Sequence, residues 1–216
     1  MTLTSFIVFG SGGHAVSIVA NMKYDSVEIK RIVDPFSRKP FLNGIRIENN
    51  FPKEISENTK FLIAIGDNYN RQKMFDQIIK FYGSGVVGSY CSSSAIKLND
   101  EHLPPGAVIM SGAYIGPKTS LSEGILINTG AKVEHDCKLE SFSSLAPGAI
   151  LSGGVRLGRG SHIGTGSIID AKVNVGANCV IGANSFLMDD LESNSVAVGN
   201  PAKSIRPRFL SEPYLK

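Results

Sequence analysis

Two sets of residues in this sequence have types and spacings suited to chemistry. The first is His135 followed directly by Asp136. An imidazole titrates near neutral pH, and a carboxylate on its second ring nitrogen fixes the tautomer, so such a pair can accept a proton as a general base. A histidine on its own more often has a surface or packing role. The elements around the pair must therefore decide between the two interpretations.

The second set is the loop Gly10–Ala15, which fits the pattern G-x-G-x-x-A. Backbone amides of such a loop, at the start of a helix, attract a phosphate group. With Asp34 further along the chain, the loop also matches the dinucleotide fingerprint, so NAD binding is one alternative. However, the region before residue 95 is only about half of a full dinucleotide fold. A turn that merely packs a helix on a strand is the other alternative.

The remaining histidines and the cysteines do not indicate a metal site. His14, His102 and His162 show no metal-ligand spacing with one another or with His135. His14 belongs to the glycine loop, and we expect His102 and His162 to face solvent. An odd number of cysteines without a C-x-x-C motif favours small buried groups over disulfides or zinc ligands. The cysteines are Cys91, Cys137 and Cys179.

The element that must position His135 is visible as a six-residue period in the second half of the chain. Every sixth residue from Leu103 to Leu187 is Leu, Ile or Val, fifteen in succession. The residue four places after each aliphatic is mostly small, and the one directly after is often glycine or small and polar. Neither a helix nor an amphipathic strand has this period. It predicts a triangular coil with one hexapeptide per side, stacked on its neighbours as a parallel β-helix.

This coil gives His135 and one glycine a definite place. His135 follows the inward Val133 by two residues, so it lies near a corner and its ring should project outward. Gly153 comes 18 residues later, one full coil on, and should stack directly over it. A backbone N–H at that place, with no side chain, can stabilise an oxyanion. The alternative for the whole rod is a purely structural scaffold.

The first half of the chain alternates strands and helices, which predicts a small parallel α/β sheet of Rossmann type. The expected strands are 5–9, 27–33, 61–65 and 86–90, and the expected helices are 14–22 and 70–81. We place the domain boundary within 91–102 and divide the chain into 1–95 and 96–216. The segment 197–207 is expected to form a last, irregular coil.

Composition excludes several classes of function. The net charge is +3 and the Lys and Arg residues are scattered, which argues against nucleic-acid binding. There is no run of about 18 apolar residues, so no membrane span is expected. The first residues lack a basic region and a cleavage site. We therefore expect a cytoplasmic protein.

The motifs together resemble the left-handed β-helix (hexapeptide-repeat) acyltransferases, and specifically the branch of sialic acid O-acetyltransferases and nucleotide-linked amino-sugar N-acetyltransferases. The resemblance covers nearly the whole chain, and it alone supplies the left-handed sense. It rests on the glycine loop and on four further segments, which are 65–67 (IGD), 127–129 (INT), 133–136 (VEHD) and 198–203 (VGNPAK).

The resemblance implies a role for each matching residue. His135 would be the general base, Asp136 the carboxylate that orients it, and Gly153 the oxyanion donor. Asn128 would contact the substrate, and the nucleotide-sugar would be bound by Gly10, Gly12, Gly13, His14 and Asp34. Acetyl-CoA would contact Gly153, Ala171 and Lys203. For Arg206 and Arg208 two interpretations stay open, contact with the CoA phosphates or a solvated basic tail.

One position departs from the family. The second histidine that the family sometimes carries nine residues after the base is Ser144 here, which can indicate a different acceptor. The sequence thus predicts an acetyl-CoA-dependent transferase without an acyl-enzyme. Its preferred acceptor is the amine of a nucleotide-linked 4-amino-6-deoxy sugar, used in surface polysaccharide or glycan synthesis. O-acetylation of sialic acid is the alternative. The resemblance further implies a homotrimer with CoA between neighbouring β-helices.

Overall fold

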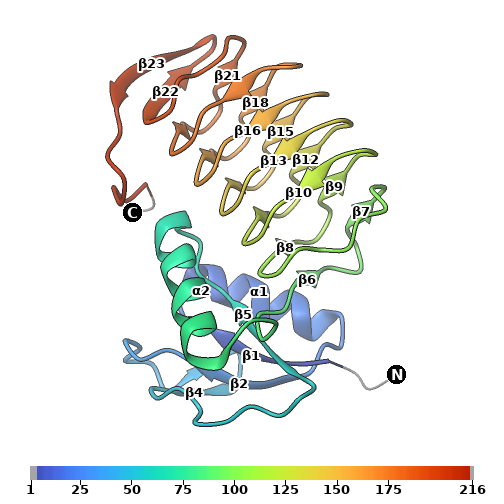
Figure 1. Cartoon of the computed structure of the whole chain (residues 1–216), viewed down its shortest axis with the longest axis vertical. Helices are drawn as coiled ribbons and strands as arrows, with labels where there is room; N and C mark the ends of the chain where they lie inside the picture. Colours follow the sequence, from blue (N-terminus) through green and yellow to red (C-terminus); the bar gives the residue numbers. More distant parts are fainter. Residues whose placement is uncertain (1–3, 215–216) are drawn as a thin grey trace.

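The computed structural model describes residues 4–214 and consists of a small α/β lobe at one end of a long β-solenoid (Figure 1). Both helices belong to the lobe, and the rest of the chain winds upward in stacked triangular coils. Within the described residues, neither helix is long and apolar enough to cross a membrane.

The lobe contains one sheet with the strand order β3-β4-β2-β1-β5. All pairs are parallel except β3–β4, which is an antiparallel hairpin. The strands are β1 (Ser5–Phe9), β2 (Ile29–Val33), β3 (Phe41–Leu42), β4 (Ile45–Glu48) and β5 (Thr59–Ile63). The helices are α1 (Gly13–Tyr24) and α2 (Asn68–Tyr82).

Each face of this sheet is covered by one helix. Along β1 the side chains alternate, as a pleated strand requires. Phe6 and Val8 pack in the same cluster as α1, whereas Ile7 and Phe9 pack with α2. The carboxyl end of β1 therefore opens into the glycine loop between the two helices, at the edge where parallel sheets bind ligands.

The solenoid has three sides, each a sheet of short strands. Within the hexapeptide coils the strands pair in parallel with partners 18 residues apart, and the last two strands of the lobe side pair antiparallel. The lobe side comprises β6 (Tyr90–Cys91), β8 (Val108–Ile109), β11 (Leu126–Ile127), β14 (Ser144–Leu145), β17 (His162–Ile163), β20 (Val180–Ile181), β22 (Ser195–Gly199) and β23 (Ala202–Pro207). The apolar side comprises β7 (Ile96–Lys97), β9 (Tyr114–Ile115), β12 (Lys132–Val133), β15 (Ile150–Leu151), β18 (Ile168–Ile169) and β21 (Phe186–Leu187). The polar side comprises β10 (Ser120–Leu121), β13 (Lys138–Leu139), β16 (Arg156–Leu157) and β19 (Asn174–Val175).

The predicted aliphatic column is the core of this solenoid. All fifteen residues from Leu103 to Leu187 belong to one cluster, with Leu103 and Leu121 partly buried at its edge. The small residues of the period, such as Ala131 and Ala149, complete the same cluster. The prediction of a left-handed parallel β-helix behind an α/β lobe is confirmed.

One prediction about the lobe was wrong, and one element of it was missed. The segment 86–90 is not a lobe strand, because only Val87 bridges to Phe61, and Tyr90 already belongs to the solenoid strand β6. The antiparallel hairpin of β3 and β4 was not predicted. The first solenoid strand, β6, thus precedes the proposed boundary at 95/96, which stays a proposal.

A buried arginine fixes the lobe on the solenoid. Arg71 of α2 is fully buried, and its guanidinium donates to the carbonyls of Gly124 at 2.8 Å and Phe142 at 3.1 Å in the solenoid. Gly124 has a φ of +64°, and a Cβ there would lie 2.3 Å from the Phe142 ring, so only glycine fits this corner. Burying an arginine is costly unless its donors are satisfied, and carbonyl oxygens satisfy this one.

Candidate active site: a glycine-loop pocket, a junction cavity and a histidine corner

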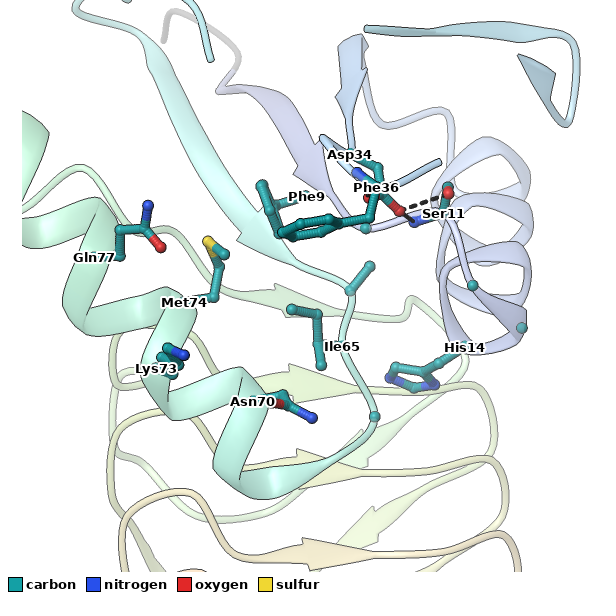
Figure 2. Close-up of a pocket in the computed structure, with 15 residues that line it drawn as sticks. Phe9, Ser11, His14, Asp34, Phe36, Ile65, Asn70, Lys73, Met74 and Gln77 are labelled. Atoms are coloured by element: carbon teal, nitrogen blue, oxygen red, sulfur yellow. Dashed lines mark hydrogen bonds between the residues drawn. The ribbon is translucent and has the colours of Figure 1, made fainter. Parts of the chain in front are cut away.

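The glycine loop lines a pocket of about 600 Å³ in the lobe (Figure 2). Gly10, Gly12, Gly13, His14 and Asp34, all predicted to bind the nucleotide-sugar, line it together. Its wall also includes the N-terminal end of α1, where free backbone amides favour a phosphate. The structure therefore brings these five sequence candidates into one site.

Asp34 orients the glycine loop. Its Oδ2 atom accepts hydrogen bonds from the backbone N–H of Ser11 at 2.9 Å and from the Ser11 hydroxyl at 2.6 Å. Its Oδ1 atom accepts the N–H of Phe36 at 3.0 Å. Both oxygens of the carboxylate are thus engaged by the chain itself, and Asp34 holds the loop in shape.

The opposite wall of this pocket was missed by sequence reasoning. It consists of one face of α2, with Asn70, Lys73 and Gln77, and of Phe36, which is almost fully exposed (Figure 2). The spacing of 70, 73 and 77 is that of one helix face, opposite to the buried residues of α2. This polar face was the available signal, but only the tertiary structure shows that it faces the glycine loop.

A second cavity of about 250 Å³ lies where the lobe meets the solenoid, and we call it the junction cavity. His14 and Gly66 line both this cavity and the glycine-loop pocket, so the two adjoin. From the solenoid the junction cavity receives Asn128, Ser144 and His162. The predicted substrate residue Asn128 is therefore close to the predicted nucleotide site.

His162 is not solvent-facing, which corrects the sequence prediction. It is half-buried, its Nδ1 lies 2.8 Å from the Ser144 hydroxyl, and its ring stacks on Tyr214 with centroids 4.2 Å apart. Ser144 and His162 are exact partners in neighbouring strands. The imidazole that the family sometimes has at position 144 is thus found one coil further on. The sequence signal for this pair was the spacing of 18 residues between Ser144 and His162, which is one full coil.

Both histidines of the junction cavity are uncharged at neutral pH. Burial, and then the positive charge of Arg71, lowers the pKa of His14 to about 4. Burial, followed by Arg71 and Arg208, lowers the pKa of His162 to about 3. A neutral imidazole offers one donor and one acceptor, so the cavity is a neutral hydrogen-bonding site.

His135 lies at an outer corner of the solenoid, between β12 and β13. Its side chain is 62% exposed, and its Nδ1 lies 2.7 Å from the Oδ2 atom of Asp136. Gly153 stacks against the ring, since a Cβ there would lie 2.7 Å from the Nε2 atom of His135. Among residues 4–214, no acceptor is found for the Gly153 N–H. A ring nitrogen and a main-chain amide from successive coils thus meet at one corner.

The structure does not bring His135 together with the junction cavity in one chain. Asn128 lies at the corner between β11 and β12, whereas His135 lies at the next corner, between β12 and β13. His135 lines neither the glycine-loop pocket nor the junction cavity. One full side of the triangle separates the two halves of the predicted site.

The residues predicted to contact acetyl-CoA differ in their availability. Ala171 is exposed one coil above Gly153, and its N–H donates to Asp170 at 2.8 Å. Lys203 is exposed and forms an ion pair with Asp189 at 3.2 Å, of the solvated type that contributes little and exchanges readily. Both contacts lie on the surface of the solenoid.

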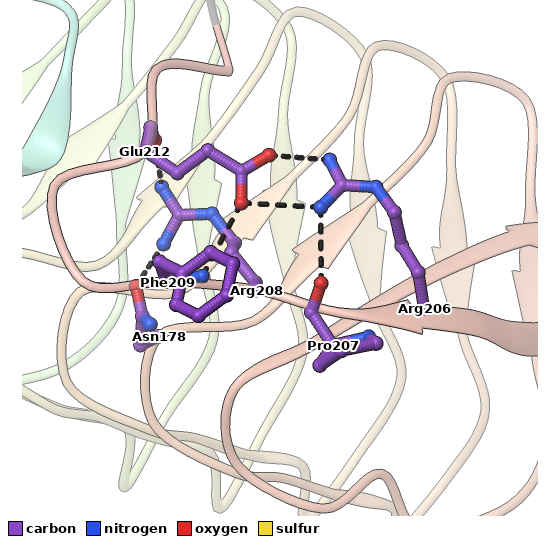
Figure 3. Close-up of polar contacts among 6 residues, drawn as sticks. All are labelled: Asn178, Arg206, Pro207, Arg208, Phe209 and Glu212. Carbon is purple, nitrogen blue, oxygen red and sulfur yellow. Dashed lines mark hydrogen bonds and ion pairs between the residues drawn. The ribbon is translucent and has the colours of Figure 1, made fainter.

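The two arginines of the C-terminal region have different roles. Arg206 is exposed and paired with Glu212 at 2.5 Å (Figure 3). Arg208 is buried, donates to the Asn178 side chain and to the Glu212 carbonyl, and lies over the Tyr214 ring. Arg208 is therefore neither a solvated tail residue nor free to meet CoA phosphates, which corrects both open interpretations for it.

Comparisons with known proteins agree with this architecture. The profile of the PglD N-terminal domain matches residues 5–78. PerB from Caulobacter crescentus, solved with CoA and GDP-perosamine, is 28% identical with a TM-score of 0.85, covering 95% of this chain and 99% of that one. The acetyltransferase domain of PglB from Neisseria gonorrhoeae is 27% identical with a TM-score of 0.83, covering 93% and 99%. WeeI from Acinetobacter baumannii, 19% identical over 94% and 100% with a TM-score of 0.83, shares the fold.

An α/β lobe of this kind on a hexapeptide solenoid, with these neighbours over almost their entire length, defines the class. Over nearly its whole length the chain is similar to left-handed β-helix acetyltransferases, among them one solved with a nucleotide-linked sugar, and its lobe matches the PglD N-terminal domain. More particularly, it is an acetyl-CoA-dependent sugar acetyltransferase.

Proposed function

We propose that the enzyme transfers the acetyl group of acetyl-CoA to the amine of a nucleotide-linked 4-amino-6-deoxy sugar, as a step in the synthesis of a surface polysaccharide or glycan. The observation that carries the proposal is the corner where His135, Asp136 and Gly153 meet, together with the lobe that carries a phosphate-binding loop. In support of nitrogen as the acceptor atom, a structural neighbour is a GDP-perosamine N-acetyltransferase.

The chemistry follows from the atoms at this corner. Asp136 holds Nδ1 of His135, which leaves Nε2 as the atom that takes the proton. The amine nitrogen forms a bond to the thioester carbonyl carbon while its proton passes to Nε2. The Gly153 N–H donates to the oxygen that becomes negative. The carbon–sulfur bond then breaks, and the imidazolium returns the proton to the thiolate of CoA.

The buried position of the cysteines fits direct transfer. Cys137 is next to Asp136 in sequence but points inward, and burial raises the pKa of its thiol. A neutral, inward thiol is a poor nucleophile. We therefore assign no acyl-enzyme to this protein.

The substrate would span the two cavities of the lobe. Its diphosphate would lie on the amides of Gly12 and Gly13, and its pyranose would enter the junction cavity beside His14 and Asn128. The Oδ1 atom of Asn128 already accepts the Thr129 N–H at 2.9 Å, so its amide nitrogen is the group that remains for the sugar.

We further propose a homotrimer in which the two halves of the site come from neighbouring copies. The apolar side of the solenoid lies between the Asn128 corner and the His135 corner. Its outward residues are largely apolar and align coil by coil, as Ile96, Tyr114, Lys132, Ile150, Ile168 and Phe186. The polar side instead presents Ser120, Lys138, Arg156 and Asn174. Cyclic association through the apolar side would bring the His135 corner of one copy towards the junction cavity of the next.

A substrate panel tests the proposed function. UDP-, GDP- and dTDP-linked 4-amino-6-deoxy sugars and sialic acid are each incubated with acetyl-CoA, and thiol release is followed. We expect turnover with an amino sugar and an amide in the product, identified by mass. Turnover with sialic acid alone would favour O-acetylation instead. If none of the panel compounds supports thiol release, the assignment is overturned.

A further inference from the structure

The last described residues form an arm that returns from the top of the solenoid to the lobe. We call Arg208–Tyr214 the C-terminal arm; it leaves β23 and ends beside the start of α2 (Figure 1). The hexapeptide period ends before this segment, and the mechanism described above does not use it. It is nevertheless fixed in place by buried and polar contacts.

The arm is anchored at its base by two arginines. Arg208 donates from its backbone N–H to the Asn194 carbonyl at 2.8 Å, and from its guanidinium to the Glu212 carbonyl at 2.6 Å. Glu212 in turn pairs with Arg206 at 2.5 Å and accepts the Phe209 N–H at 3.2 Å (Figure 3). These contacts fold the arm into a compact turn with a defined direction.

The tip of the arm reaches the junction cavity. The Tyr214 hydroxyl accepts the N–H of Asn68 at 2.9 Å and donates to the carbonyl of Gly66 at 3.2 Å. Its ring stacks on His162 at an interplanar angle of 25°. Gly66 and His162 both line the junction cavity, so Tyr214 supports two of its walls from behind.

His162 has one ring nitrogen to offer to a ligand. Its Nδ1 is occupied by Ser144, and no partner for its Nε2 is found in the part of the chain that the structure describes. A fully buried side-chain atom without a partner occurs among those residues only at Asn99 Oδ1. The unpartnered Nε2 atom of His162 is therefore not fully buried. His162 itself lines the junction cavity.

We propose that His162 recognises a hydroxyl of the acceptor sugar through its Nε2 atom, and that Tyr214 is a positioning residue that holds the imidazole in place. The ligand class is a neutral pyranose carrying hydroxyl groups, since the cavity presents the uncharged polar groups of His14, Asn128 and His162. This inference rests on the proposed function. It assigns acceptor specificity to the hydrogen-bonded pair of Ser144 and His162.

The contacts define the variants that test it. In His162→Gln the side-chain amide can replace Nε2, whereas in His162→Ala nothing can. Tyr214→Phe keeps the stacked ring but loses both hydrogen bonds of the hydroxyl. Phe209→Ala is the matched control, because Phe209 lies on the same arm and its side chain is 77% exposed.

Steady-state kinetics with the best nucleotide-sugar of the panel gives the first readout. We expect His162→Ala to raise the KM for the nucleotide-sugar by about 3- to 10-fold, the effect of one lost hydrogen bond. The kcat and the KM for acetyl-CoA should stay within about twofold, because the interaction is the same in ground and transition states. His162→Gln should restore most of the affinity, Tyr214→Phe should be intermediate, and Phe209→Ala should match the wild type.

Calorimetry separates recognition of the sugar from general damage to the lobe. His162→Ala should weaken binding of the nucleotide-sugar by the same factor and leave binding of the bare nucleoside diphosphate unchanged. An equal loss for both ligands, or no loss for either, would overturn the proposal. If the wild type acetylates none of the panel sugars, the proposed function is refuted, and this inference with it. If it acetylates one and His162→Ala keeps the wild-type KM, only this inference fails.

Discussion

At the scale of single residues, His135 is unusual in being exposed and yet fixed on both sides, by Asp136 at Nδ1 and by Gly153 against its ring. His135→Ala should lower kcat by at least about 100-fold, because a general base contributes 10²–10⁴ in rate. The melting temperature should change little, since the His135 side chain is 62% exposed. Thiol release at saturating substrate measures the rate, and near-normal turnover would refute the assignment.

Asp136→Asn provides the matched control for this experiment. Asp136 has a φ of +59°, a left-handed conformation that asparagine also tolerates, so the fold should be retained. Loss of the negative charge should lower the rate less than loss of His135. A variant that unfolds would instead show that the corner depends on the carboxylate.

The two half-buried, neutral histidines predict how stability depends on pH. The pKa values of His14 and His162 are about 4 and about 3, below the 6.5 of an unfolded chain. Between 6.5 and these values the unfolded chain binds more protons than the folded chain. The contribution of the two histidines to the free energy of unfolding is therefore complete above about pH 6.5 and is lost as the pH falls through about 4 for His14 and about 3 for His162. Urea unfolding at a series of pH values checks this. His162→Gln should flatten the slope, and an unchanged slope would contradict the burial argument.

At the scale of elements, the sequence was informative wherever a repeat or alternation had to bury a face. The column from Leu103 to Leu187 predicted the solenoid, and β1 was predicted with its observed bounds, because aliphatic spacing directly reflects burial. The hairpin of β3 and β4 was missed although Asn43-Gly44 is a typical two-residue turn, with both residues at positive φ. Segment 86–90 was misread because a short apolar run does not reveal which sheet it joins.

The candidate site shows the same limit. The glycine loop and the stacking of Gly153 on His135 follow from local pattern and from the 18-residue coil. The Asn70 face of α2 and the contact of His162 with Tyr214 do not, because they depend on how lobe, solenoid and arm pack. Nothing in the local sequence around His162 signals that an aromatic ring 52 residues later covers it.

At the scale of the whole molecule, the separation of the two half-sites leads to a complementation test. His135→Ala removes the proposed base, and Gly12→Asp places a negative charge on the glycine loop, where a Cβ meets nothing within 4 Å. If neighbouring copies share each site, co-expression of the two inactive variants should restore about a quarter of the wild-type activity. Light scattering on the same sample should give three chains per particle.

The alternative outcome of this test is equally clear. If one chain contains the complete site, every chain in the mixture carries one defect and no activity returns. A monomer by light scattering would also contradict the arrangement, because it would leave the apolar side of the solenoid uncovered.

The contacts of the C-terminal arm fix the number of coils in the solenoid. Solenoids commonly gain or lose repeats without harm, because each coil touches only its neighbours. Here the arm connects the last coil to the start of α2, so the lobe, the solenoid and the arm form a closed loop. One extra coil between β17 and β20 would lift Arg208 by about 4.8 Å and draw Tyr214 away from His162. The arm therefore limits the number of coils, and a chain with more coils would need a longer arm to keep the junction cavity in shape.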